Sequence, residues 1–327
     1  MISPERIEKK KTRARRKTRY YSCQHKINKH AQSRTKTRTK IEMVDQRPQR
    51  NRKRVGQILI ATCASAVGYF FAKRLKQFFD QTSEYININN NNRAQFLFVG
   101  DSLTQRGFDS QKGWVTQFAS VYQRKADCVN RGYSGYNSKW VLDLIKKNPG
   151  LFLLNTNDNG KVKPALVVVF LGANDAAVNH KKEYAVALND YSENLKTILD
   201  MYKGIPRIVI TPPPIIEKDR VKHALETMNV KTPDRLYQHT EKYAVAAEKV
   251  ARELGVGLAD AFDKFEKYGA KMDELFSDGL HFSVLGESLL FQVVSDAIKQ
   301  TYPWLIPEKM RLDAPLHGEL AALMKNL

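Results

Sequence analysis

Three side chains of this sequence have the types that serine-based hydrolysis requires. Ser102 follows the apolar run 96–99, and Asp278 and His281 stand three positions apart later in the chain. A serine hydroxyl is a poor nucleophile until a histidine accepts its proton, and the histidine needs a carboxylate to hold its tautomer and stabilise its charged form. A spacing of three places both side chains on the same side of one helical turn or tight loop. Ser102, His281 and Asp278 can therefore supply the three parts.

Two further loops offer hydrogen-bond donors for an oxyanion. The tetrahedral intermediate of acyl transfer needs such donors, and a glycine N–H together with an asparagine amide can provide them. Gly135 and Asn174 are the candidates, with the Ser102 N–H as a third. Each motif alone has a plainer interpretation, since Asp and Ser often cap helices and the Asn174-Asp175 pair can form an Asx turn. The combination favours chemistry because four separate loops carry complementary roles.

Short apolar runs that alternate with longer helical patterns must position these loops. Near-continuous apolar strands such as 165–171 are typical of a parallel sheet that is covered on both faces. We predict a three-layer α/β/α sandwich around a five-stranded, mainly parallel sheet, in which ligands lie beyond the carboxyl ends of the strands. The predicted strands are 96–99, 128–130, 165–171, 207–210 and 255–260, and the predicted helices are 114–124, 139–146, 183–202, 233–254 and 285–301.

Four blocks in this order resemble the hallmark motifs of the SGNH, or GDSL, hydrolase superfamily. They are GDSL at 100–103, SGYN at 134–137, GAND at 172–175 and DGLH at 278–281. The fuller phrases NRGYSGYN, FLGANDAA, VITPPP and SDGLHFS look like the isoamyl acetate-hydrolysing esterase branch of that superfamily. The resemblance covers roughly residues 95–300 and implies the flavodoxin-like SGNH hydrolase fold.

The resemblance also implies a role for each matched residue. Ser102 is the nucleophile of a serine esterase, His281 the general base and then the acid, and Asp278 its orienting partner. Gly135 and Asn174 complete the oxyanion hole with Ser102. We therefore expect a lipase-like catalytic triad that works through an acyl-enzyme intermediate.

The implied substrates are small, short-chain acyl esters, such as acetates of small alcohols. Lipid and carbohydrate acyl esters are handled by other branches of the superfamily and stay open as alternatives. Tyr136, Asn137 and Phe282 are candidate substrate-binding residues, although apolar residues near strand ends more often pack the core. The chemistry requires no metal, and the scattered histidines and cysteines form no ligand pattern, so we predict no cofactor.

The net charge of +20 belongs mainly to the N-terminal segment. Residues 1–54 hold 20 Lys+Arg and four acidic residues, a net charge of +16, and are predicted to form a disordered basic arm. The 18 uncharged residues 55–72 are predicted to be a transmembrane or signal-anchor helix, with packing on the domain or an organelle transit sequence as the alternatives. The remaining predicted parts are a polar Asn-rich linker at 73–94, the hydrolase domain at 95–301 and a C-terminal tail at 302–327.

The basic arm gives rise to a rival function. A segment of that charge can bind nucleic acid or an anionic membrane electrostatically. It lacks the interleaved aromatic residues that build a base-stacking platform, so nucleic acid is the less favoured partner. A pseudoenzyme is a third alternative, although every matched catalytic position is filled. We expect a membrane-associated location, with an organelle-targeted or cytoplasmic location as the alternative.

Overall fold

The computed structural model describes residues 93–109, 111–154 and 163–325. The predicted basic arm, the predicted membrane anchor at 55–72 and nearly all of the predicted linker lie outside these residues, so those three interpretations stay predictions. Among the helices of the described part, none combines the length and the apolar character that a bilayer span requires.

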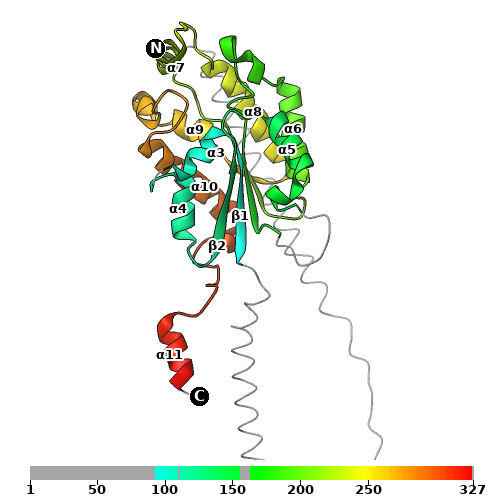
Figure 1. Ribbon diagram of the computed structural model, residues 1–327, viewed down its shortest axis with the longest axis vertical. Coiled ribbons are helices and arrows are strands. Elements are labelled where there is room, and N and C mark those ends of the chain that lie inside the picture. Colours follow the sequence, from blue (N-terminus) through cyan, green and yellow to red (C-terminus); the bar gives the residue numbers. More distant parts are fainter. Residues whose placement is uncertain (1–92, 110, 155–162, 326–327) are drawn as a thin grey trace, which may run out of the picture. The chain divides into compact units, whose positions relative to one another are not determined.

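Five parallel strands form the centre of the molecule (Figure 1). The strands are β1 (Ala94–Gly100), β2 (Ala126–Gly132), β3 (Leu166–Phe170), β4 (Arg207–Ile210) and β5 (Gly257–Ala259). Their order across the sheet is β2-β1-β3-β4-β5, and every neighbouring pair runs parallel. This is the flavodoxin-like order, which confirms the predicted fold class.

Helices cover both faces of the sheet, as the three-layer prediction requires. One layer holds α3 (Ser102–Gln105), α4 (Trp114–Val121), α9 (Ala261–Glu266) and α10 (Val284–Thr301), and the other holds α5 (Ser138–Lys147), α6 (Leu188–Asp200) and α8 (Tyr237–Leu254) (Figure 1). The helix α7 (Glu217–Met228) follows β4, and α11 (His317–Lys325) ends the described part.

The central strand β3 shows why the sheet needs two helical layers. Leu166, Val168 and Phe170 belong to the core on one face, and Val167 and Val169 belong to the core on the other. All five side chains are at most 1% exposed. A strand that is apolar on both faces is stable only when both faces are covered, because each exposed face would leave its apolar surface in water.

Several helical segments differ from the predictions, and α3, α9 and α11 have no predicted counterpart. The predicted helix 183–202 starts only at Leu188, after the short 3₁₀ segment η4 (Asn179–Tyr184). Helix α7 was not predicted at all. Only Arg220 and Ala224 are buried in this helix, so its sequence lacks the apolar periodicity from which a helix can be predicted.

The segment after α10 packs at the amino end of the sheet. Lys125 Nζ donates to the carbonyl of Pro307 at 2.6 Å, and the N–H of Asp313 donates to the carbonyl of Arg124 at 2.7 Å. Arg124 and Lys125 lie immediately before the start of β2. The observed contacts of the C-terminal segment are therefore on the end of the sheet opposite the loops that carry Ser102 and Asn174.

Gly100 at the carboxyl end of β1 offers a test of this packing. A Cβ atom there would lie 2.1 Å from Thr104 Oγ1 and 2.6 Å from the carbonyl oxygen of Phe170. Because the backbone of β3 cannot withdraw freely, Gly100→Ala should lower the free energy of unfolding by about 1–3 kcal/mol. Thermal or urea unfolding measures the effect.

The matched control is Gly150→Ala in the 3₁₀ segment η3 (Pro149–Phe152), where nothing lies within 4 Å of an added Cβ. That variant should be neutral or slightly stabilising. Equal unfolding midpoints for the two variants would contradict the close packing at Gly100.

Candidate active site

Ser102 lies where β1 passes into helix α3. Asp101 caps this helix, since its Oδ1 accepts from the N–H of Leu103 at 2.9 Å and its carbonyl accepts from the N–H groups of Thr104 and Gln105. Because Asp101 rather than Ser102 provides the cap, the serine hydroxyl is left for another partner. These capping bonds also do not involve the Ser102 N–H.

The partner of the serine hydroxyl is His281. Ser102 Oγ and His281 Nε2 are 3.0 Å apart, and His281 Nδ1 and Asp278 Oδ2 are 2.7 Å apart. A carboxylate can only accept, so Nδ1 carries the proton of the neutral ring and Nε2 is the acceptor for the serine hydroxyl. The structure thus brings the three residues together in the order that serine hydrolysis requires.

One short loop holds both Asp278 and His281. Phe276 and Phe282 form an antiparallel bridge at its base. Inside the loop, Asp278 Oδ1 accepts from the backbone N–H groups of Leu280 at 3.0 Å and His281 at 2.8 Å. The carboxylate therefore fixes the backbone of the residue whose ring it also orients.

The charge of Asp278 is strongly favoured. Burial raises the pKa of this carboxyl. The hydrogen bonds from His281 and the nearby charges of His281 and Arg220 lower the pKa by more than burial raises it, so the net pKa is well below its usual range. Asp278 is consequently an anion throughout the working pH range of an esterase and can stabilise a protonated His281.

Asn174 follows β3, the neighbour of β1 in the sheet. Its Oδ1 accepts from Arg235 Nη2 at 2.7 Å, and its Nδ2 donates to the carbonyl of Tyr136 at 2.8 Å. An amide nitrogen carries two N–H groups, so one remains available. The chain crosses from one side of β1 to the other between β2 and β3, and such a switch point is where flavodoxin-like sheets bind ligands.

Gly135 lies in the loop that Asn174 contacts. Its φ of 81° is in the left-handed region that favours glycine. The preceding Ser134 N–H donates to Gln105 Oε1 at 2.8 Å, which fastens the glycine loop to helix α3. The two predicted oxyanion donors are thus joined to one another and to the helix that starts at Ser102.

The predicted substrate-binding residues have different surroundings. Phe282 lines a cavity beside His281. Asn137 caps α5 instead, because its Oδ1 accepts from the N–H of Trp140 and its Nδ2 donates to the carbonyl of Tyr184. Tyr136 packs edge-on against the Trp140 ring at 6.0 Å between centroids. A role of these three residues in binding substrate stays a prediction.

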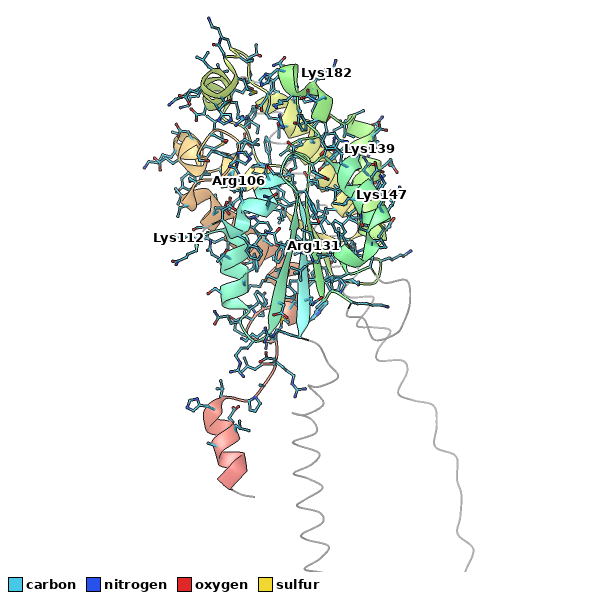
Figure 2. The ribbon with its side chains drawn as sticks, viewed as in Figure 1. Arg106, Lys112, Arg131, Lys139, Lys147 and Lys182 are labelled. Carbon is cyan, nitrogen blue, oxygen red and sulfur yellow. The ribbon has the colours of Figure 1, made fainter. Side chains whose placement is uncertain are left out.

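The cavity beside His281 encloses about 180 Å³. Its walls combine apolar and ionisable side chains: Leu103, Arg106, Asp109, His281, Phe282, Ser283, Val284 and Glu287. Arg106 is exposed and belongs to the short helix η2 (Arg106–Phe108) directly after α3 (Figure 2). Glu287 is buried, its Oε2 accepts from the N–H of Trp114 at 2.8 Å, and burial raises its pKa to about 7. Neither Arg106 nor Glu287 was predicted from the sequence to belong to the site.

Two more carboxyls are buried near the site. Burial, together with the nearby charge of Asp175, raises the pKa of Asp101 to about 7, and burial raises the pKa of Asp175 to about 6. Both oxygens of Asp175 accept from the N–H of Ser138, at 3.0 and 3.1 Å. Asp175 thereby ties the loop after β3 to the start of α5.

Within the described ranges, no three His, Cys, Asp or Glu side chains are grouped so that they could hold a metal ion. The prediction that the reaction needs no cofactor stays a prediction.

Residues 98–289, more than half of the chain, match the GDSL-like Lipase/Acylhydrolase family. This chain belongs to that family. A GDSL esterase/lipase of Arabidopsis thaliana is 35% identical over 230 residues, which cover 68% of this chain and 92% of the relative. This GDSL hydrolase is also 33% identical to the isoamyl acetate-hydrolyzing esterase 1 homolog of Mus musculus over 224 residues, which cover 64% of this chain and 85% of that one. The predicted resemblance is confirmed, and the protein is a carboxylic ester hydrolase.

This GDSL hydrolase is similar to a solved lipase/acylhydrolase from Enterococcus faecalis. The similar region covers 63% of the present chain and 96% of the bacterial chain, with 23% identity and a TM-score of 0.49.

Asp101 of this GDSL hydrolase should affect how the free energy of unfolding depends on pH. Its folded pKa of about 7 lies above the unfolded value of about 3.9, so between these values the folded state holds a proton that the unfolded state has released. Stability contributed through Asp101 therefore falls as pH rises from about 4 to 7. Asp101→Asn does not titrate, and the stability difference between wild type and variant should shrink over that range.

Urea unfolding at pH 5 and pH 8 measures this difference. Asp143→Asn is the control, because the Asp143 side chain is 43% exposed and the bond from Lys139 lowers its pKa, so it titrates below the window. A difference between wild type and Asp101→Asn that stays constant across the window would contradict a protonated, buried Asp101.

Proposed function

We propose that the protein hydrolyses short-chain acyl esters, with acetates of small alcohols as the substrate class, through an acyl-enzyme on Ser102. The observation that carries the proposal is the pair of contacts that join Ser102 Oγ to His281 Nε2 at 3.0 Å and His281 Nδ1 to Asp278 at 2.7 Å. The acetate preference draws on the name of the isoamyl acetate-hydrolyzing relatives. The choice of a small alcohol fits the cavity of about 180 Å³ beside His281, which is below the range of roughly 300–1,000 Å³ that is usual for drug-sized ligands.

Acylation begins with attack of Ser102 Oγ on the ester carbonyl carbon. The hydroxyl proton moves to His281 Nε2 as the new C–O bond forms, and the carbonyl electron pair moves onto the oxygen. Asp278 stabilises the resulting imidazolium through Nδ1–H. When the tetrahedral intermediate collapses, the bond to the alcohol breaks, and Nε2 returns the proton to the departing alkoxide.

The developing oxyanion has three proposed donors. Asn174 keeps one amide N–H after its bond to Tyr136, and the N–H groups of Gly135 and Ser102 complete the set. Donors fixed before the reaction stabilise the new charge without reorganising, which makes such a site effective.

Deacylation repeats these steps with water as the nucleophile. His281 Nε2 accepts a proton from the attacking water, and the same donors stabilise the second oxyanion. Collapse of that intermediate releases the short carboxylic acid and returns the proton to Ser102 Oγ.

The alcohol part of the substrate is proposed to occupy the cavity beside His281. The alcohol leaves with the proton that Nε2 delivers, so its oxygen must approach that nitrogen. Leu103 and Phe282 offer apolar contact for a short alkyl group in this cavity. Lipid and carbohydrate acyl esters remain the alternative substrates, and binding through the basic arm concerns residues outside the described part.

A chain-length series of p-nitrophenyl esters tests the proposal on the full-length protein. The values of kcat/KM should be highest for the acetate and fall as the acyl chain lengthens. Ser102→Ala should lower kcat by about 10⁶, because nothing else in the site can form the acyl-enzyme. The exposed Ser120→Ala on α4 is the matched control and should behave as wild type.

The two parts of the proposal can fail separately. Hydrolysis that persists in Ser102→Ala would overturn the nucleophile. Rates that rise towards octanoate would retain the nucleophile and replace the short-chain class with a lipid-like one.

A further inference from the structure

Behind the candidate site lies a row of buried charges that reaches from the triad acid to the oxyanion amide. Arg220 Nε and Nη2 donate to the two carboxylate oxygens of Asp234, each at 2.8 Å. Arg220 Nη1 also lies 3.2 Å from Asp278 Oδ2. Arg235 follows, with Nη1 donating to the carbonyl of Asp234 at 2.9 Å and Nη2 donating to Asn174 Oδ1 at 2.7 Å. The row therefore connects two groups that the proposed reaction uses together.

Arg235 and the carbonyl of Tyr136 together fix the orientation of the Asn174 amide. A guanidinium carries only donors, so the amide oxygen must face Arg235 and the amide nitrogen must face away from it. The nitrogen then meets the carbonyl of Tyr136 and keeps one N–H for the oxyanion. Without Arg235 only the bond to the Tyr136 carbonyl opposes rotation of the amide, and in the rotated form the amide oxygen would place negative charge where the reaction creates an anion.

Arg220 acts on the other end of the row. Its Nη1 contacts both the Oδ2 atom and the carbonyl oxygen of Asp278, each at 3.2 Å. Asp278 Oδ2 is also the atom that accepts from His281 Nδ1. Arg220 thus holds the carboxylate in line with the imidazole, and its positive charge offsets part of the negative charge that the imidazolium would otherwise meet.

Stability of the fold alone does not explain why these charged side chains are buried. The side chains of Arg220 and Arg235 are each 4% exposed and that of Asp234 is 6% exposed. Removing charges from water is so unfavourable that well-packed apolar residues often stabilise a core as much or more. The two arginines balance Asp234 and Asp278 in charge, and the fork geometry of arginine gives the bidentate contact a fixed orientation.

Both ends of the row are also attached to the loops of the site. The carbonyl of Asp234 accepts from the N–H of Val178, four residues after Asn174, at 2.9 Å. The N–H of Ile216, at the start of α7, donates to the carbonyl of Gly279 at 3.0 Å. The row therefore joins the backbones of the two loops as well as their side chains.

We propose that Arg220, Asp234 and Arg235 are positioning residues that hold the triad carboxylate and the oxyanion amide in one fixed arrangement. This inference rests on the proposed function. None of the three is proposed to touch the reacting atoms.

The effect of Arg235 is tested by a double-mutant cycle with Asn174 on the full-length protein. Arg235→Gln alone should lower kcat for p-nitrophenyl acetate by about 10² with little change in KM, because the oxyanion forms only in the transition state. In the Asn174→Ala background the same change should lower kcat less than threefold, since Arg235 has no amide left to orient. Equal losses in both backgrounds would show a general structural effect and overturn the role of Arg235.

The effect of Arg220 is tested by the pH profile of kcat/KM. The charged groups facing Asp278 are His281 and Arg220, with Asp234 behind Arg220. Arg106, Asp109 and Glu287 line the cavity beside His281 and are the same in wild type and in each Arg220 variant. In Arg220→Gln no positive charge offsets the Asp278 carboxylate, so the carboxylate favours the protonated form of His281 more strongly. The acidic limb of the profile should therefore move to higher pH. Arg220→Lys keeps the positive charge and should leave the limb near its wild-type position, even though the bidentate contact with Asp234 is lost.

Arg207→Gln is the matched control. Arg207 is a mostly buried arginine at the amino end of β4, where Nη1 donates to the carbonyl of Leu199 at 2.8 Å. Its replacement disturbs a mostly buried charge at the end of the sheet opposite the site. Arg207→Gln should therefore leave the pH profile of kcat/KM unchanged and should lower kcat equally little in the wild-type and Asn174→Ala backgrounds. Circular dichroism and thermal unfolding identify any variant that does not fold.

Two failures can be told apart. Active wild type with folded Arg220 and Arg235 variants that match Arg207→Gln would overturn the positioning role alone. A folded wild type that hydrolyses no ester would overturn the proposed function, and the positioning role with it.

Discussion

The hydrogen bond between Ser102 Oγ and His281 Nε2 joins two loops that are 179 residues apart in the chain. Almost every feature of the fold contributes to keeping those loops adjacent. The parallel sheet carries Ser102 and Asn174 to the same edge, because β1 and β3 are neighbours and both loops follow carboxyl ends. Helix α10 and the bridge between Phe276 and Phe282 fix the loop of His281 from the other side. A change that separates these loops moves His281, the proposed base, away from Ser102, the proposed nucleophile, without altering either residue.

The site contains more buried ionisable groups than its proposed reaction uses. Asp101 and Asp175 are buried with raised pKa values, while Arg220 and Arg235 are buried as cations. Such groups are unfavourable in a protein interior unless they are well paired. These groups are concentrated behind the loops of the site. Their burial lowers the free energy of unfolding, and their hydrogen bonds hold the loops in a single arrangement. The cores on the two faces of the sheet, which are nearly all apolar, can support that loss.

The sequence was most informative where apolar periodicity and chemistry coincide. Most of the strands could be predicted because they contain short apolar runs, whereas the mostly polar β2 (ADCVNRG) was predicted only at 128–130. Ser102, Gly135, Asn174, Asp278 and His281 stand in segments that follow or flank such elements. Helix α7 could not be predicted by the same reasoning, since its buried positions are an arginine and an alanine. Arg235 lay inside a predicted helix as one charged residue among many. Burial of a charge depends on partners far away in the sequence, which periodicity does not reveal.

We propose that Ser102, activated by His281, carries the acyl group. Incubation of the full-length protein with a fluorophosphonate, followed by mass spectrometry of the peptides, tests this role without any assumption about the natural ester. We expect one adduct on the peptide that contains Ser102, formed in wild type and largely absent in His281→Ala. Labelling of a different residue, or equal labelling of Ser102 with and without His281, would contradict it.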